Sequence, residues 1–252
     1  MSSKKCKSCI LTSYFTLKPH PQRSDSNNKI IGIDGDGFVE NNSYDYICDF
    51  YDSVIDLDID VVIFHDNLSI EYTEQYSNDK ISFVKVNESK YSNNDYRFLC
   101  YLRWLRENKY ESVFLVDIAD VTVANDPSFI EVNQSICFCK DTLKLMEYRY
   151  GPVSFSDLCN GLSLDYSTIK DIEDLDLLNM GVIGASYKNI LRFLDLFWKY
   201  RAKCGHPEQN INMSLGNYVA RMHFDRIHYG YPFCSEFKKY QTERKDVYFI
   251  HK

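Results

Sequence analysis

Residues 111–127 read ESVFLVDIADVTVANDP, and this stretch decides the fold that we expect for the chain. The apolar run at 112–116 has the length of a buried strand, and two carboxylates, Asp117 and Asp120, follow it directly. A second short extended stretch then leads to Pro127. In open α/β sheets, ligands bind beyond the carboxyl ends of the strands. We therefore expect Asp117 and Asp120 to face a ligand site at a sheet edge.

Two neighbouring carboxylates at a strand end are poorly placed for stability, because like charges at short range repel. The arrangement becomes favourable when a divalent cation lies between the carboxylates and a diphosphate. Mg²⁺ and Mn²⁺ prefer oxygen ligands, and they commonly combine one or two carboxylates with phosphate oxygens of a substrate. Taken alone, the pair also fits a helix N-cap followed by a solvated aspartate.

The rest of the chain alternates strand-like and helix-like segments. Strands are predicted at 9–16, 61–64, 81–86, 112–116, 135–139, 177–184 and 247–250, and helices at 44–57, 69–76, 94–108, 190–203 and 207–221. Such alternation is typical of an α/β fold with a largely parallel sheet and helices on its faces. No linker-like composition interrupts the 252 residues, so we expect one domain over 1–252.

Composition and charge exclude several classes of protein. The net charge is −7 and no long basic run is present, which argues against a nucleic-acid partner held by phosphate contacts. The apolar runs have strand length and are too short to span a bilayer, and the first residues do not resemble a signal peptide. We therefore expect no integral membrane segment and a cytoplasmic location.

The nine cysteines are scattered along a chain without a secretory signal, so we expect reduced thiols. Cys6 and Cys9 have the spacing of a zinc-ligand pair, but no matching second pair follows. Cys137 and Cys139 have the alternation of a strand, which would place both thiols on the same face. We do not expect a structural zinc site.

The acidic stretch and its surroundings resemble the nucleotide-sugar glycosyltransferases of the GT-A fold. In that superfamily a strand ends in a D-x-D motif or a looser variant, and the variant here is D-I-A-D over 117–120, with one extra residue. The resemblance covers residues 10–252. Within the superfamily, the chain is similar to the compact soluble transferases of large algal DNA viruses and some bacteria. It implies a GT-A-like single domain with a mixed, mostly parallel central sheet flanked by helices. About 9–125 would form the nucleotide-binding half, and about 126–252 the acceptor and donor-sugar half.

The resemblance also implies a set of site residues. Mn²⁺ or Mg²⁺ would be held by Asp120 and the late His251, and Asp117 would contact either the metal or the ribose of the nucleotide. The other residues expected to contact the nucleotide-sugar are Thr12, Ser13 and Tyr14 after the first strand, Asp95 on the base, Arg97 on the diphosphate or sugar, Asn179 in the donor-sugar pocket, Gln209 near the reacting carbon, and Lys252 on the diphosphate.

The reaction implied is transfer of a hexosyl or pentosyl group from a nucleotide diphosphate sugar to a hydroxyl of a glycan or glycoprotein, in the host cytoplasm if the chain is viral. UDP is the expected nucleotide, with GDP as the alternative. The metal, Arg97 and Lys252 would stabilise charge on the leaving nucleoside diphosphate. In an inverting reaction Glu208 would be the base, with Asp157 or Asp165 as alternatives. In a retaining reaction Glu208 would lie beside the anomeric carbon, and both outcomes stay open.

A rival hypothesis concerns 30–38, where an apolar run precedes D-G-D-G. This resembles the nucleophile loop of haloacid-dehalogenase-type phosphatases, in which Asp34 would attack phosphorus, Asp36 would act as general acid and Mg²⁺ would bind nearby. Phe38 stands where that motif normally has Thr or Ser, and we prefer to interpret the loop as a Gly-Asp turn between two segments of the chain. A third hypothesis is a non-catalytic module that binds a nucleotide-sugar.

Overall fold

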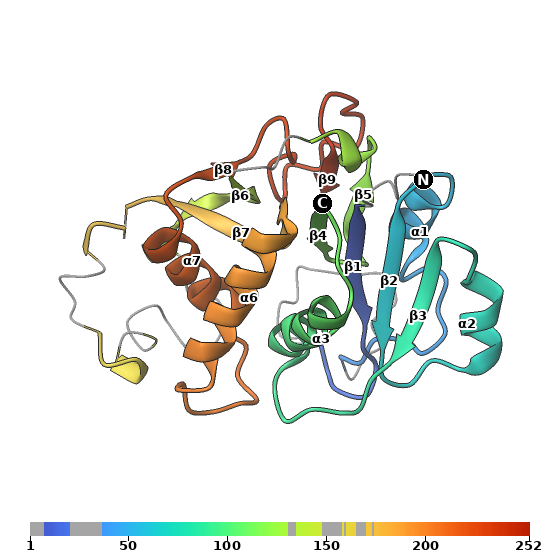
Figure 1. Cartoon of the computed structure of the whole chain (residues 1–252), viewed down its shortest axis with the longest axis horizontal. Helices are drawn as coiled ribbons and strands as arrows, with labels where there is room; N and C mark the ends of the chain where they lie inside the picture. Colours follow the sequence, from blue (N-terminus) through green and yellow to red (C-terminus); the bar gives the residue numbers. More distant parts are fainter. Residues whose placement is uncertain are drawn as a thin grey trace, which may run out of the picture.

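The computed structural model describes residues 8–20, 37–130, 135–147, 158, 160–164, 170–172 and 174–252. These residues form a seven-stranded sheet with helices packed against it, and a separate two-stranded sheet lies near its centre (Figure 1). The order of the large sheet is β3 (Ile81–Lys85), β2 (Asp60–His65), β1 (Cys9–Tyr14), β4 (Ser112–Val116), β7 (Asp176–Ser186), β6 (Ile136–Lys144) and β8 (Ile227–Tyr229). The small sheet pairs β5 (Val121–Val123) with β9 (Phe249–His251).

The large sheet is mixed. Strands β3, β2, β1 and β4 run parallel to one another, β7 is antiparallel to both β4 and β6, and β8 is parallel to β6. The expected mixed, mostly parallel sheet with flanking helices is therefore confirmed. Because β1 and β4 are adjacent and parallel, the segments that follow them leave the sheet at the same edge.

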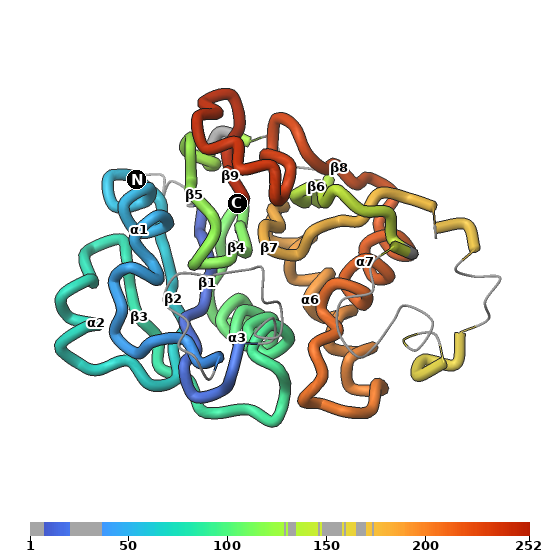
Figure 2. Tube along the Cα trace, turned by 180° about the vertical axis from the view of Figure 1, so that it is seen from behind, coloured from blue at the N-terminus to red at the C-terminus, as the bar shows by residue number. Residues whose placement is uncertain are grey.

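The helices are α1 (Cys48–Val54), α2 (Ile70–Tyr76), α3 (Asn93–Glu107), α6 (Tyr187–Arg201) and α7 (Asn212–His223), with short 3₁₀ turns η1 (Pro127–Phe129) and η2 (Leu145–Glu147). Strand residues alternate between two hydrophobic clusters: Leu11 and Leu115 pack with α3, α6 and α7, whereas Ile10 and Phe114 pack with α1. Both faces of the sheet are thus covered, as a largely parallel sheet requires (Figure 2).

Several predicted boundaries are wrong, and one strand was not predicted. The strand expected at 135–139 continues to Lys144, and the helix expected at 190–203 begins at Tyr187. The helix expected at 44–57 spans only Cys48–Val54, and the helix expected at 207–221 begins at Asn212. Residues 207–211 form a turn instead, because their carbonyl groups bond to the side chain of Arg201 rather than to a helix. Strand β8 has only three residues, which are too few for an alternating pattern to indicate a strand.

The expectation of uniformly reduced thiols is wrong for one pair, because Cys139 and Cys234 form a disulfide. Their Cα atoms lie 5.2 Å apart although 95 residues separate them in the sequence, and that distance suits a disulfide. Cys137 and Cys139 pack into the same hydrophobic cluster, as expected for two positions on one face of a strand.

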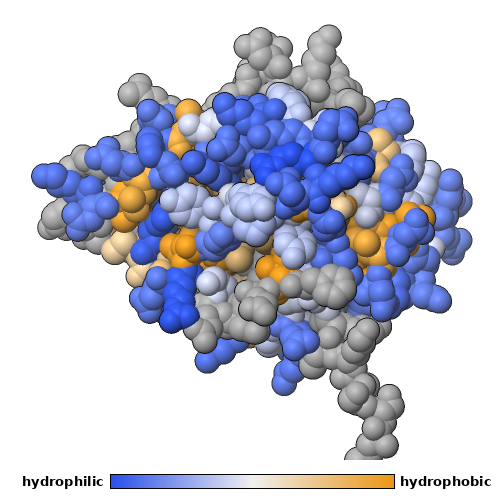
Figure 3. Space-filling model, turned by 90° about the horizontal axis from the view of Figure 1, so that it is seen from above, coloured by the Kyte–Doolittle hydropathy of each residue, from blue (hydrophilic) through white to orange (hydrophobic). Residues whose placement is uncertain are grey.

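Hydrophilic side chains cover most of the face seen in Figure 3, and hydrophobic ones appear there in small separate groups. Among the residues that the structure describes, no helix has the length and hydropathy needed to cross a membrane.

Candidate active site

The candidate site is a cavity of about 330 Å³ beyond the carboxyl ends of β1 and β4. Side chains from distant parts of the chain line it. They include Ser13 of β1, Arg97 of α3, Asn179 of β7 and Asn212 of α7. A cavity of this size is in the range that holds small-molecule and cofactor ligands. It lies where ligands bind in open α/β sheets.

Three potential metal ligands meet at the wall of this cavity. Asp117, Asp120 and His251 each offer one ligand atom, and the three atoms all lie within 4.8 Å of one another. Asp117 directly follows β4 and Asp120 directly precedes β5. The pairing of β5 with β9 sets Val121 opposite His251, so the last strand of the chain brings the imidazole to the two carboxylates.

The donor set fits a divalent cation. His251 is 1% exposed, and its Nδ1 has no hydrogen-bond partner among the described residues. Its Nε2 lies 3.4 Å from Oδ2 of Asp120, which is longer than a normal hydrogen bond. Two carboxylates and an imidazole whose ring nitrogens have no hydrogen-bond partner among the described residues suit Mn²⁺ or Mg²⁺, of which Mn²⁺ accepts the imidazole more readily.

Gly181 makes room for this cluster. Its carbonyl accepts a hydrogen bond of 2.7 Å from the backbone N–H of Asp117, so the two backbones are held together. A Cβ at position 181 would lie 2.7 Å from Nε2 of His251 and 2.9 Å from Oδ2 of Asp117. The ring of His251 and the carboxylate of Asp117 would have to shift to admit a Cβ, so glycine suits this position.

Arg97 is a buried cation at the site. The residue is 6% exposed, and its guanidinium forms an ion pair with Oδ1 of Asp117 and donates a 3.1 Å hydrogen bond to the carbonyl of Met180. Burial lowers the pKa of Arg97 from its ordinary value, although Asp120 and other neighbours oppose this shift. Burial also acts to raise the pKa of Asp120, but His251, His20 and Arg97 outweigh it, and the net shift is downward. The carboxylate of Asp120 is therefore charged at neutral pH.

A chain of hydrogen bonds fixes the amide of Asn179 in the cavity. Its Nδ2 donates to Oδ2 of Asp141 at 3.0 Å, and its Oδ1 accepts from the N–H of Gly181 at 2.8 Å. The backbone N–H of Thr142 in turn donates to the carboxylate of Asp141 at 2.7 Å. Among the described residues, Asp141 accepts from one N–H of this amide, and a ligand in the cavity can accept from the other.

His20 and Tyr46 also line the cavity, and the sequence did not single them out. Burial lowers the pKa of His20 to about 4, with Arg97 adding to this shift and Asp120 opposing it. His20 is therefore neutral at pH 7. Burial raises the pKa of Tyr46 above its ordinary value, so that side chain is a neutral phenol.

The structure brings together six of the residues expected at the site: Ser13, Arg97, Asp117, Asp120, Asn179 and His251. Thr12, Tyr14, Gln209 and Lys252 do not line the cavity. The hydroxyl of Tyr14 accepts instead from the N–H of Ser43 at 2.9 Å, and Lys252 pairs with Asp49.

The two acidic residues expected at the base and at the reacting carbon also lie elsewhere. Asp95 is fully buried against Arg201, and the side chain of Glu208 is 67% exposed beside His206. Neither lines the cavity. Asp157, Asp165, Asp34 and Asp36 lie outside the described residues, and their roles stay predictions. Asp141, which does line the cavity, had no signal in the sequence beyond its place at a strand.

Comparison with known proteins identifies which solved structures share this fold. No protein-family model and no curated protein matches the chain. Among solved structures, the galactosyltransferase LgtC in complex with donor and acceptor sugar analogues matches with a TM-score of 0.53 at 12% identity, over 96% of this chain and 86% of that chain. An active-site mutant of LgtC matches with a TM-score of 0.54 at 12% identity, over the same 96% and 86%.

The bifunctional glycosyltransferase WbbM, in its apo form, matches with a TM-score of 0.58 at 11% identity. That match covers 98% of this chain but only 46% of the WbbM chain, so the present chain spans less than half of that protein. These likenesses, together with the sheet topology, show that the chain has a GT-A-like glycosyltransferase fold.

Proposed function

We propose that the protein is a metal-dependent glycosyltransferase, which moves a hexosyl or pentosyl group from a nucleotide diphosphate sugar to a hydroxyl of an acceptor glycan or glycoprotein. The observation that carries the proposal is the cluster of Asp117, Asp120 and His251 within 4.8 Å at the cavity. The likeness to the two glycosyltransferases supports it. We expect UDP as the nucleotide and the cytoplasm, that of the host if the chain is viral, as the location.

Each residue has a definite task in this proposal. Asp117, Asp120 and His251 would hold Mn²⁺ or Mg²⁺, which when bound neutralises charge on the leaving nucleoside diphosphate. Arg97 adds a fixed positive charge at the same wall, where its position is set before the ligand arrives. The amide of Asn179, oriented by Asp141, would donate to a hydroxyl of the sugar.

The residue that takes the proton from the acceptor hydroxyl is also a proposal. In an inverting reaction Glu208 would take the acceptor proton, or Asp157 or Asp165 in its place, and in a retaining reaction Glu208 and Gln209 would lie beside the anomeric carbon. Glu208 is 67% exposed and does not line the cavity, so either role requires its side chain to turn toward the cavity when the acceptor binds.

The test is the melting temperature of the protein against a panel of nucleoside diphosphates, with and without Mn²⁺. A ligand at about 100 times its Kd stabilises the folded state by about 2.7 kcal/mol, which corresponds to a shift of about 5–10 °C for a chain of this size. We expect one nucleotide to give such a shift only with Mn²⁺. Asp120→Ala should abolish the shift, and Asp45→Ala, an exposed residue outside the cavity, should preserve it.

Absence of a shift with every nucleotide would contradict the proposal. The phosphatase hypothesis then has its own assay, hydrolysis of an aryl phosphate with Mg²⁺ that is lost in Asp34→Asn. A non-catalytic module would show the Mn²⁺-dependent shift but no turnover of the nucleotide-sugar.

A further inference from the structure

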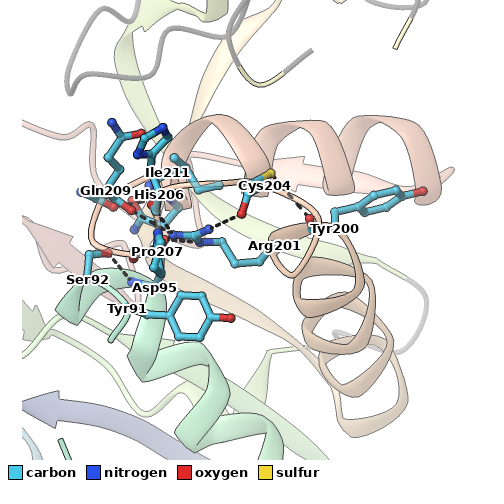
Figure 4. Close-up of polar contacts among 12 residues, drawn as sticks. Tyr91, Ser92, Asp95, Tyr200, Arg201, Cys204, His206, Pro207, Gln209 and Ile211 are labelled. Atoms are coloured by element: carbon cyan, nitrogen blue, oxygen red, sulfur yellow. Dashed lines mark hydrogen bonds and ion pairs between the residues drawn. The ribbon is translucent and has the colours of Figure 1, made fainter. Parts of the chain in front are cut away.

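Arg201 and Asp95 form an ion pair that is sealed inside the protein beside the candidate site. Nε of Arg201, at the end of α6, lies 2.7 Å from Oδ2 of Asp95, in the first turn of α3, and both side chains are 0% exposed (Figure 4). Taking two charges out of water costs several kcal/mol for each ion, and their attraction balances this only when the remaining donors and acceptors are also satisfied. The partners that satisfy them therefore indicate what the pair is for.

Those partners belong to the turn between α6 and α7. Nη2 of Arg201 lies 3.3 Å from the carbonyl oxygen of His206, 2.9 Å from that of Pro207 and 3.2 Å from that of Gln209. The other carboxylate oxygen of Asp95 accepts from the N–H of Ile211 at 3.3 Å. The pair thus holds the turn at several points, from its middle to the residue before α7 (Figure 4).

The turn needs such an anchor, because its backbone is not in a relaxed conformation. His206 has a φ of 54°, in the left-handed region. That conformation costs a non-glycine residue about 1–2 kcal/mol. Strained residues persist only where their surroundings over-determine them, and they are frequent at functional sites.

The turn over 206–211 leads directly to side chains that line the cavity. Asn210, Asn212 and Met213 all line it, and they follow directly on the carbonyl groups that Arg201 holds. Asn212 is 3% exposed, and its Oδ1 has no hydrogen-bond partner among the described residues. A buried amide oxygen without a partner is costly, so its position in the cavity points to a ligand that donates a hydrogen bond.

We propose that Arg201, which does not line the cavity, is a positioning residue that sets Asn212 against a hydroxyl group of the bound nucleotide-sugar. The inference rests on the proposed function. Oδ1 of Asn212 accepts the hydrogen bond from the ligand hydroxyl, and Arg201 with Asp95 fixes where that oxygen stands. A displacement of about 1 Å by a distant mutation can slow a reaction about 100-fold.

Three variants and a control test this. Arg201→Lys keeps the charge beside Asp95 but lacks the planar fork that reaches several carbonyl groups at once. Asp95→Leu combined with Arg201→Met removes both charges, which usually preserves the fold, and it carries the test if Arg201→Lys does not fold. Asn212→Ala removes the proposed ligand contact. Arg106→Lys, in an exposed ion pair with Asp195, is the matched control.

The measurement is kcat and KM for release of the nucleoside diphosphate from its sugar conjugate, with the Kd of the free nucleoside diphosphate in Mn²⁺. We expect both Arg201 variants to keep that Kd within about twofold and to lower kcat by at least about tenfold. Adding Asn212→Ala to Arg201→Lys should lower kcat no further, because both changes remove the same contact. Arg106→Lys should change neither quantity.

Two outcomes would overturn the inference, and they are distinguishable. Wild-type kcat in a folded Arg201 variant, with a lowered melting temperature, would mean that the pair serves stability alone. Additive losses from Arg201→Lys and Asn212→Ala would mean that Arg201 does not act through Asn212. A wild-type protein without turnover would instead contradict the proposed function, and this inference with it.

Discussion

Nε2 of His251 lies 3.4 Å from Oδ2 of Asp120, and strand pairing brings these distant residues together. Val121 stands opposite His251 in the β5–β9 pair, and the N–H of Lys252 donates to the carbonyl of Asp120 at 2.9 Å. A slip of one residue in the register would turn the imidazole to the other face of the small sheet. The metal cluster therefore depends on the last strand being in place.

Gly181→Ala should abolish Mn²⁺ binding. The added Cβ would lie 2.7 Å from Nε2 of His251 and 2.9 Å from Oδ2 of Asp117, so the ligand atoms must separate. Calorimetric titration of the protein with Mn²⁺ measures this directly. Gly184→Ala is the matched control on the same strand, because its Cβ would meet the core rings of Phe114 and Phe233. It should lower the melting temperature but leave Mn²⁺ binding intact; equal Mn²⁺ affinity in both variants would contradict the account.

Arg97→Lys should weaken binding of the nucleoside diphosphate by about tenfold in the presence of Mn²⁺, because a lysine ammonium cannot reproduce the planar, multiple contacts of a guanidinium. Arg97 contacts the carboxylate of Asp117 and the carbonyl of Met180 at once. Arg103→Lys, an exposed position on the same helix, should bind as the wild type does. Unchanged affinity in Arg97→Lys would show that this guanidinium does not face the phosphates.

Reduction of the disulfide should lower the melting temperature. Cys139 and Cys234 close a loop of 95 residues, and the loss of such a crosslink typically costs about 2–4 kcal/mol. The measurement is the unfolding midpoint with and without a reductant. In Cys139→Ala/Cys234→Ala the reductant should have no further effect, whereas Cys48→Ser should respond as the wild type does. A wild-type midpoint that ignores the reductant would show that the bond does not contribute.

The metal-free protein should lose stability as the pH falls from about 6.5 to about 4, and His20 should account for part of the loss. Burial lowers the pKa of His20 in the folded protein to about 4 from its ordinary 6.5. Between these values the unfolded chain binds more protons than the folded one, so acid favours unfolding. In EDTA, the unfolding midpoint of His20→Gln should therefore fall less steeply over this range. A slope equal to that of the wild type would contradict this, and exposed His206→Gln is the control.

Local patterns explain how much of the fold the sequence could predict. The strand at 112–116 was predictable because all five residues are apolar or small and all five are buried, and the two carboxylates stand directly beyond it. Ser69, whose side chain caps α2 by accepting from the N–H of Tyr72, marked that helix equally well. The order of weak motifs then pointed to the GT-A-like fold.

What the sequence missed depends on contacts between distant residues. Pro207 and Glu208 look like the first turn of a helix, since proline and acidic residues favour that position. In the structure, the guanidinium of Arg201 donates to carbonyl groups of this segment, and the helix begins at Asn212. Arg201 and Asp95 lie 106 residues apart, so no local pattern reveals the pair. Asp141 was not predicted as a site residue, because no local pattern in the sequence shows which residue of a strand will line the cavity.

The most direct test of the central claim is release of the nucleoside diphosphate from its sugar conjugate, measured with Mn²⁺ and with EDTA, in the wild type, Asp120→Asn and Asp45→Asn. We predict turnover in the wild type and in Asp45→Asn that requires Mn²⁺, and a loss of at least about 100-fold in Asp120→Asn. Turnover that persists in EDTA, or that survives in Asp120→Asn, would contradict metal-dependent glycosyl transfer at this site.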